Sequence, residues 1–320
     1  MQPDEAPGKT DYRALAARMG YGPLRARLKK QAGLWAGDVH QGRGLFRLDS
    51  FLSVDRSIWT VLGMLGLHDR ATRNFLDFRV VENVLPVRRL DPAFEGFRLL
   101  QLADLHCDLH PGFSAALLPV LDALKYDAAV FTGDYHNKIA SPPERSLAAM
   151  KEIVAQVHGP RFAILGNHDF IEKVAFLEAI GLPVLINESG FIERNGARLW
   201  FCGIDDPHYF QADDLVRARA RIPSDIACIL LSHSPEPYRE AERQGFSTML
   251  CGHTHGGQIC LPGGIPIIRN ARIPRKFMTG LWTYRSLTGY TSRGTGACGV
   301  PARFFCPPEI TIHTLVVGPA

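Results

Sequence analysis

Long hydrophobic runs are what this 320-residue sequence lacks most clearly. Its most apolar window is Ser57–Leu67, which is shorter than the roughly 20 residues that a helix needs to cross a bilayer. The segment Met1–Glu5 has no basic start followed by an apolar core, so it does not resemble a signal peptide. The absence of both signals predicts a cytoplasmic protein, and attachment to the inner face of the membrane is left open.

A strong excess of charge of one sign is also missing. Lys and Arg together number 36 against 32 Asp and Glu, which gives a net charge of +4 at pH 7. This excess is too small to indicate nucleic acid as a partner. It suits an anionic small-molecule substrate or an anionic membrane surface.

Cysteine is scarce and odd in number, with seven in the chain. Four lie in or beside apolar runs and are predicted to be buried thiols: Cys107, Cys202, Cys228 and Cys251. Cys298 and Cys306 flank a loop that contains proline, and whether they pair is left open.

The first 74 residues are predicted to form a basic helical extension, followed by one domain over residues 75–320. Residues 12–31 show a helical pattern that Gly20-Tyr21-Gly22-Pro23 interrupts, which favours two short helices. Leu52–Phe75 is again helical in type, with Asp49 or Ser50 as the N-cap. The extension either packs on the main domain or rests on an anionic membrane. The apolar membrane contact would then be Trp59, Leu62, Leu65 and Leu67.

From Asp77 onward, short apolar runs alternate with amphipathic stretches. The predicted strands are Phe78–Val87, Phe97–Ala103, Ala128–Thr132, Arg161–Leu165, Pro183–Ile186, Gly190–Glu193, Arg198–Ile204, Ile226–Leu231, Ser247–Cys251 and Glu309–Val317. The predicted helices are Phe113–Leu124, Glu144–Val157, Ile171–Ile180, Asp213–Arg221 and Glu236–Gln244. This order indicates an α/β layered domain with mixed sheets.

Five of the predicted strands end in residues of the types that bind metals. These strand ends are Asp104-Leu105-His106, Gly133-Asp134, Gly166-Asn167-His168-Asp169, Ser232-His233 and Gly252-His253-Thr254-His255. Open α/β sheets place their sites at the carboxyl ends of strands, so these groups are expected to converge. Taken singly, a solvated loop or a common turn explains most of them. All five in this order are hard to assign to chance.

The residue types indicate a pair of divalent ions. A carboxylate has two oxygens and can bridge two cations, and Asp134 suits this role because Gly133 lets the backbone approach closely. Further ligand atoms are available on Asp104, His106, Asn167, His233, His253 and His255. The mixture of oxygen and imidazole nitrogen suits Mn, Fe, Zn or Co and suits Ca poorly.

His168 is expected just outside the ligand shell, where a protonated imidazole would donate to a leaving-group oxygen. Asp169 is predicted to orient it.

These five blocks resemble the signature of the calcineurin-like metallophosphoesterase superfamily, over roughly residues 75–318 and without a substitution. The resemblance implies a four-layer αββα sandwich and a dinuclear centre, with Mn favoured over Fe, Zn or Mg. One ion would take Asp104, His106, Asp134 and His255, and the other Asp134, Asn167, His233 and His253. His168 would be the acid near the scissile phosphate, with Asp169 as its partner.

A narrower resemblance is to the bacterial YkuE- and YaeI-like subgroup. The segments that carry it are Gly256-Gly257-Gln258-Ile259, Ser292-Arg293-Gly294-Thr295-Gly296, Pro301-Ala302-Arg303 and Pro307-Pro308-Glu309-Ile310. That subgroup is similar to UDP-2,3-diacylglucosamine hydrolases. The expected activity is cleavage of a phosphodiester or pyrophosphate bond in a lipid- or nucleotide-linked substrate. The alternatives are a cyclic-nucleotide or general phosphodiesterase and a non-catalytic scaffold, although no ligand is missing here. Arg293 either contacts a phosphate or caps its loop.

Overall fold

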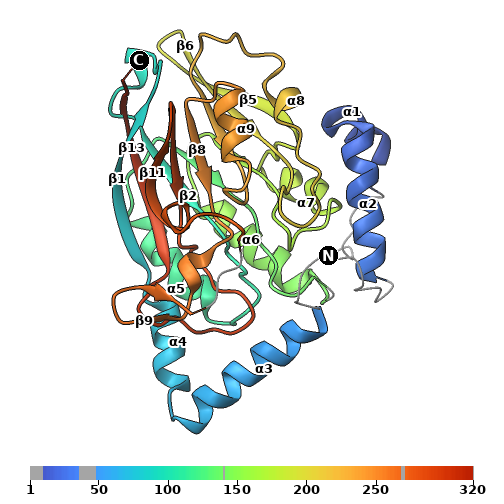
Figure 1. The fold of residues 1–320 in the computed structure, drawn as a ribbon, viewed down its shortest axis with the longest axis vertical. Coiled ribbons are helices and arrows are strands. Elements are labelled where there is room, and N and C mark those ends of the chain that lie inside the picture. Colours follow the sequence, from blue (N-terminus) through green and yellow to red (C-terminus); the bar gives the residue numbers. More distant parts are fainter. Residues whose placement is uncertain (1–9, 36–47, 140, 268–270, 320) are drawn as a thin grey trace, which may run out of the picture.

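The computed structural model describes residues 10–35, 48–139, 141–267 and 271–319. Within these residues, one sheet has five strands in the order β1-β13-β2-β3-β4, and a second has six in the order β11-β12-β8-β7-β6-β5 (Figure 1). The strands of the first sheet are β1 (Arg79–Val87), β13 (Glu309–Val317), β2 (Arg98–Leu102), β3 (Ala128–Phe131) and β4 (Arg161–Ala163). Those of the second are β11 (Gly280–Tyr284), β12 (Leu287–Thr291), β8 (Thr248–Cys251), β7 (Cys228–Leu231), β6 (Ala197–Gly203) and β5 (Glu188–Arg194).

Both sheets are mixed. In the first, β1 and β13 are parallel, β13 and β2 are antiparallel, and β2, β3 and β4 are parallel. In the second, β12, β8, β7 and β6 are parallel, whereas β11 and β5 pair antiparallel at the two edges. A small hairpin joins β9 (Cys260–Leu261) to β10 (Ile265–Pro266). Short 3₁₀ turns occupy Pro92–Phe94, His255–Gly257 and Arg275–Phe277.

Side chains alternate along the central strands between separate cores, as the period of two in a strand requires. On β2, Leu99 lies between the two sheets and Leu100 lies beneath helices. On β7, Ile229 lies between the sheets, and Leu230 faces the helices on the other side. Because these strands are covered on both faces, apolar residues occupy consecutive positions in them.

Helices complete the outer layers. The first sheet is covered by α5 (Phe113–Asp122), α6 (Glu144–Gln156) and α7 (Lys173–Ala179), and the second by α8 (Leu215–Arg219) and α9 (Tyr238–Arg243). The predicted four-layer αββα sandwich with mixed sheets is therefore confirmed.

Some local predictions are wrong. Of the predicted strand Pro183–Ile186, only Val184 pairs, in a single bridge to Ala163. Three residues later, Asn187 has a positive φ of 58°, which turns the chain away from the edge of β4. The sequence analysis also missed the hairpin of β11 and β12. Its turn passes through Arg285, whose φ of 50° is unusual for a residue other than glycine.

All seven cysteines are free thiols in the structure, so Cys298 and Cys306 do not pair. The four thiols predicted to be buried are buried.

Four helices lie in the described part of the N-terminal region: α1 (Tyr12–Met19), α2 (Tyr21–Trp35), α3 (Leu48–Met64) and α4 (His68–Leu76). The predicted break between two short helices is confirmed, because Gly20, at φ 98°, separates α1 from α2. The predicted helix Leu52–Phe75 is instead two helices, separated near Gly66 at φ 66°. The predicted N-cap at Asp49 or Ser50 is wrong, since α3 already begins at Leu48.

Of the four side chains predicted to contact a membrane, Leu65 is the exposed one. Leu62 is buried with Val300 and Ala302, and Trp59 and Leu67 pack partly against the same cluster. The apolar pattern of α3 did not reveal that residues far along the chain, Val300 and Ala302, cover its apolar face. No helix in the described part of the chain is both long enough and apolar enough to span a bilayer.

The basic residues of α1 and α2 bind the sandwich. Arg18 pairs with Glu178 and Glu188. Arg27 is fully buried and pairs with Asp205, and it also donates to the backbone oxygen of Asp169. Burial raises the pKa of Asp205, and Arg27 opposes this rise. The extension thus supplies the cation that allows Asp205 to be buried.

We expect Arg27→Ala to lower the free energy of unfolding by about 3–5 kcal/mol, because the Asp205 carboxylate would stay buried without its partner. Urea unfolding followed by circular dichroism measures this loss. The matched control is Arg25→Ala, at an exposed position of the same helix, which should change the value by less than about 0.5 kcal/mol. Arg27→Met combined with Asp205→Leu should recover most of the loss. Equal losses for Arg27→Ala and Arg25→Ala would contradict a stabilising role for the buried pair.

Candidate metal centre

The five predicted strand ends meet at one place. The loops after β2, β3 and β4 come from the first sheet, and those after β7 and β8 come from the second. The close approach of two loops requires glycine at position 133: a Cβ there would lie 2.6 Å from the backbone nitrogen of Gly166. The predicted close approach of the backbone at Gly133, next to Asp134, is thus present in the structure.

The backbone at these loop ends is unusual. Five of the predicted ligands have a positive φ: Asp104 (51°), His106 (38°), Asp134 (57°), His253 (69°) and His255 (50°). Left-handed conformations are uncommon for residues other than glycine. Their concentration in one place is typical of functional sites, where the surrounding structure enforces strain.

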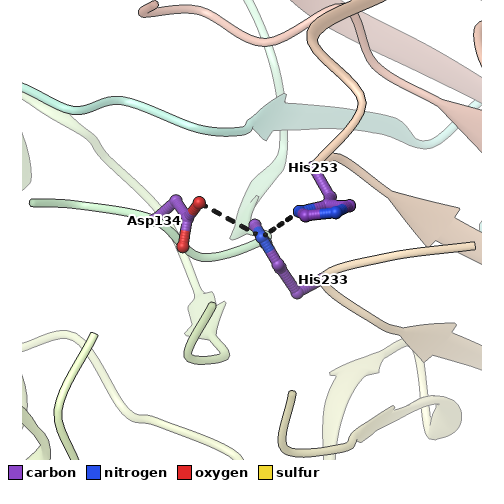
Figure 2. A group of neighbouring side chains, drawn as sticks. All are labelled: Asp134, His233 and His253. Carbon is purple, nitrogen blue, oxygen red and sulfur yellow. Dashed lines mark hydrogen bonds and ion pairs between the residues drawn. The ribbon is translucent and has the colours of Figure 1, made fainter. Parts of the chain in front are cut away.

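His233 lies at the centre of one half of the site. Its Nε2 is 3.2 Å from Asp134 Oδ2 and 2.9 Å from Asn167 Oδ1. The ring of His253 is adjacent, with Nδ1 3.2 Å from His233 Nε2. Figure 2 shows that Asp134, His233 and His253 point toward one another, and their ligand atoms all lie within 4.8 Å of one another. This spacing fits a single cation.

The other half of the site contains Asp104, His106 and His255. His106 Nε2 lies 3.6 Å from Asp134 Oδ2, and the His106 and His255 rings stack with centroids 5.2 Å apart. Asp104 accepts from the backbone nitrogen of His253 at 2.8 Å, which joins the two halves. His106 Nε2 is buried and has no hydrogen-bond partner among the described residues. A buried nitrogen without a partner is costly unless a ligand uses its lone pair.

Two histidines are held in the orientation that metal ligands need. His106 Nδ1 lies 2.8 Å from the backbone oxygen of His136, and His233 Nδ1 lies 2.8 Å from that of Thr132. A carbonyl accepts only from an N–H, so these contacts place a proton on Nδ1 and direct Nε2 toward Asp134. The residues present therefore fit divalent metal, because imidazole nitrogens from both halves of the site face the Asp134 carboxylate.

The buried Asp134 carboxylate stabilises positive charge on the groups beside it. Burial opposes ionisation of Asp134, yet His233 and His168 hold the pKa of Asp134 well below its usual range. Burial also opposes the charged form of His233, but Asp134 raises the pKa of His233 to about 10. Burial lowers the pKa of His106 to about 4, which keeps this imidazole neutral, the form that binds metals.

The pKa values of Asp104 and His255 shift in opposite directions. Burial raises the pKa of the Asp104 carboxyl to about 7, although His233 opposes this rise. Burial lowers the pKa of His255 well below its usual range, and His106 and Arg303 act in the same direction.

His168 lies beside the predicted ligands, as expected. Its ring centroid is 4.9 Å from that of His106, and its backbone nitrogen donates to Asp134 Oδ1 at 2.8 Å. The predicted role of Asp169 needs correction: the group that orients the His168 ring is the backbone oxygen of Asn137, 2.5 Å from Nδ1.

Asp169 instead fixes the loops of the site. Its carboxylate accepts from the backbone nitrogens of Asp134 at 2.7 Å and Gly166 at 3.1 Å. It also pairs with Lys173 at 2.8 Å. Sequence adjacency to His168 suggested contact with the ring, but the fold turns the side chain toward the neighbouring loop.

The sequence analysis missed two residues that support the site. Arg303 is fully buried and donates to the backbone oxygens of His255 at 2.9 Å and Gly294 at 3.1 Å. It appeared in the sequence only as part of a subgroup motif, with no role. The His208 ring is tilted by 44° against that of His253, with centroids 4.2 Å apart, and its Nδ1 lies 3.0 Å from Glu236 Oε1. No local pattern marked His208, because its contact partners are distant in the sequence.

Arg293, for which two roles were open, donates from Nε to Thr279 Oγ1 at 3.1 Å. Its backbone oxygen accepts from Arg303 at 2.8 Å. Both contacts hold the loop, which favours the structural role.

Comparison with known proteins agrees with this geometry. Residues 97–257 match the family described as calcineurin-like phosphoesterase. The bovine transmembrane protein with metallophosphoesterase domain is 28% identical over 284 residues, which is 82% of this chain and 62% of that protein. The chain thus spans less than two thirds of the length of this relative.

Two bacterial relatives are matched over more of their length. Metallophosphoesterase YkuE of Bacillus subtilis is 27% identical over 73% of this chain and 84% of its own length. Phosphodiesterase YaeI of Escherichia coli is 27% identical over 69% of this chain and 82% of its own length.

The fold and the site define a metallophosphoesterase-type domain. The chain belongs to the calcineurin-like phosphoesterase family, whose matched region covers half of it. The family resemblance seen in the motifs is confirmed.

We expect Asp134→Asn to reduce the metal content, because an amide has only one oxygen able to bind a cation and cannot bridge two ions well. Elemental analysis of dialysed protein should give two ions per chain for the unaltered protein and one or fewer for the variant. Asp225→Asn, at an exposed position, is the control and should retain both. Retention of two ions by Asp134→Asn would exclude Asp134 as a bridge.

Proposed function

We propose that this chain hydrolyses a phosphodiester or pyrophosphate bond at two divalent metal ions. Asp104, His106, Asp134 and His255 would hold one ion. Asp134, Asn167, His233 and His253 would hold the other. The observation that carries the proposal is the position of Asp134 Oδ2, 3.6 Å from His106 Nε2 and 3.2 Å from His233 Nε2. Mn is the favoured metal, and Fe, Zn or Mg are the alternatives.

The ions would lower the pKa of bound water and neutralise charge on the phosphate oxygens. The protein residues then have two tasks. The carbonyl of Asn137 keeps a proton on His168 Nδ1, so Nε2 is the nitrogen that exchanges a proton with the substrate. Asp169 and Lys173 hold the loops that carry Asp134 and His168 in fixed positions.

The proton balance of the reaction is simple. Water forms a bond to phosphorus while the bond from phosphorus to the leaving oxygen breaks. His168 Nε2 gives its proton to that oxygen, and a proton released from the attacking water restores the acid. No other reactant is consumed.

The favoured substrate is lipid- or nucleotide-linked, such as UDP-2,3-diacylglucosamine. A cyclic-nucleotide or general phosphodiesterase activity is the alternative, and the name of the Escherichia coli relative supports the wider phosphodiesterase class. A substrate panel with Mn²⁺ separates them: bis-p-nitrophenyl phosphate, p-nitrophenyl phosphate, cyclic nucleotides and UDP-2,3-diacylglucosamine. Preference for the monoester over every diester and pyrophosphate would contradict the proposal.

We expect His168→Ala to retain both metal ions and to lose kcat by on the order of 10²–10⁴-fold, as for removal of a general acid. Steady-state kinetics on bis-p-nitrophenyl phosphate, together with elemental analysis, measure both properties. Unchanged kcat in a fully metallated variant would show that His168 does not protonate the leaving group.

Peripheral contact with a membrane is also part of the proposal, at the inner face of a cytoplasmic membrane. Three exposed apolar side chains near the end of α3 support it: Val61, Met64 and Leu65. Two exposed cations, Arg70 and Arg73, follow on α4. An apolar edge beside basic residues suits an anionic bilayer surface. Figure 1 shows α3 extending away from the body of the sandwich.

We expect the unaltered chain to float with vesicles that contain phosphatidylglycerol, and the triple variant Val61→Asp, Met64→Asp and Leu65→Asp to remain at the bottom of the gradient. The added carboxylates would be repelled by the anionic surface. Val216→Asp, at an exposed apolar position on α8, is the control. Equal flotation of all three proteins, or of none, would remove the membrane contact.

A further inference from the structure

A cavity of about 770 Å³ opens beside the candidate metal centre. The α3 helix, the loops after β2 and β3, the start of α6 and the segment 299–301 line it. None of the seven predicted metal ligands is among its lining residues. Its volume is in the range of small-molecule sites, so it is large enough to hold a substantial part of a substrate.

The cavity adjoins His168. Asn137, which lines the cavity, accepts a hydrogen bond from His168 Nδ1 on its backbone oxygen. The side-chain oxygen of Asn137 accepts from the backbone nitrogen of Gly299, another lining residue, at 2.9 Å. Cys298 Sγ lies 3.8 Å from His168 Nε2. The residues that orient the proposed acid therefore also form a wall of the cavity.

The α3 helix contributes Asp55, Arg56 and Trp59 to the lining of the cavity. Asp55 lies against Gly299, where a Cβ would be 2.3 Å from Asp55 Oδ1. Trp59 stacks on His68 with ring centroids 4.0 Å apart, and its backbone oxygen lies 2.7 Å from His68 Nε2. This part of the lining is thus held in place by contacts with both α4 and the 299–301 segment.

Among the described residues, three cationic side chains line the cavity: Arg56, Lys138 and Arg145. All three side chains are exposed, and none forms an ion pair with another described residue. Unpaired cations around a concave surface favour an anionic ligand.

Three carboxylates also line the cavity, and neighbouring groups of the protein contact two of them, Asp108 and Asp55. Asp108 accepts from the backbone nitrogen of Asn137 at 2.7 Å and lies 3.5 Å from His136. Asp55 is half-buried against Gly299. Glu144 lies in the first turn of α6, where the helix dipole stabilises its charge.

We propose that this cavity binds the leaving group of the substrate and that Arg56, Lys138 and Arg145 recognise a second phosphate in it. The inference rests on the proposed function, because His168 defines which side of the scissile bond departs. Of the phosphodiester and pyrophosphate bonds named in the proposed function, a subsite for a second phosphate favours the pyrophosphate. The helical extension then contributes directly to substrate recognition.

Two substrates that differ only in the second phosphate test this proposal: diphenyl phosphate and P¹,P²-diphenyl pyrophosphate, with Mn²⁺ and the full chain. The unaltered protein should have the higher kcat/KM on the pyrophosphate. In the triple variant Arg56→Gln, Lys138→Gln and Arg145→Gln, the ratio of the two kcat/KM values should fall by on the order of 10–100-fold, because charge-assisted contacts to phosphate are lost. The control Arg285→Gln, an exposed arginine on the β11–β12 turn, should keep the ratio.

A binding measurement separates this proposal from the catalytic one. Phenyl phosphate, the product that would leave the pyrophosphate, should bind the metal-depleted full chain in isothermal titration calorimetry. Binding by the triple variant should be at least about tenfold weaker, as expected for loss of charged contacts. Equal binding by both proteins, or an unchanged kcat/KM ratio, would overturn the subsite while diester hydrolysis continued. A third outcome is possible: the triple variant loses binding of phenyl phosphate, but the unaltered protein hydrolyses neither ester. This result would support the anion subsite and would overturn both the proposed function and the leaving-group assignment.

Discussion

Burial of the Asp134 carboxylate is the constraint on which the site depends. A carboxylate removed from water is costly unless neighbouring groups compensate its charge. Here His233 and His106 approach one oxygen, and the backbone nitrogen of His168 donates to the other. Asp169 in turn binds the backbone nitrogen of Asp134 and is held by Lys173. The loops after β2, β4 and β7 therefore all contact this one carboxylate.

The network extends to the N-terminal helices. Arg27 of α2 donates to the backbone oxygen of Asp169, and Gln31 accepts from the backbone nitrogen of Ile171 at 3.0 Å. Both contacts are directly behind the loop that carries Asn167 and His168. The α2 helix, which the sequence predicts as part of a basic extension, thus makes polar contacts with the loop that carries His168. Apolar side chains of α1 and α2 also belong to the hydrophobic core of the sandwich: Leu15, Met19 and Leu24.

The sequence predicted the layered fold and the convergence of the five strand ends because both depend on local signals. Apolar runs such as Ala128–Phe131 identify buried strands, and the polar residue after each run marks the carboxyl end. The sequence did not predict the partner of the His168 ring, because a backbone oxygen such as that of Asn137 has no signature in residue type. It also missed the buried Arg303 and the cavity wall formed by α3. Those depend on contacts between segments far apart in the chain, such as Trp59 and the segment 299–301.

The position of β13 has a consequence for the time course of synthesis. β13 lies between β1 and β2 in the sheet, and β1 pairs along its whole length with β13, at a sequence separation of 230 residues. At roughly 5–20 residues per second, a ribosome needs about 10–45 s to make that intervening chain. During this interval β1 has been made but its partner has not. An unpaired strand of this kind can pair with other chains, so the newly made protein is most exposed to aggregation before its last strand emerges.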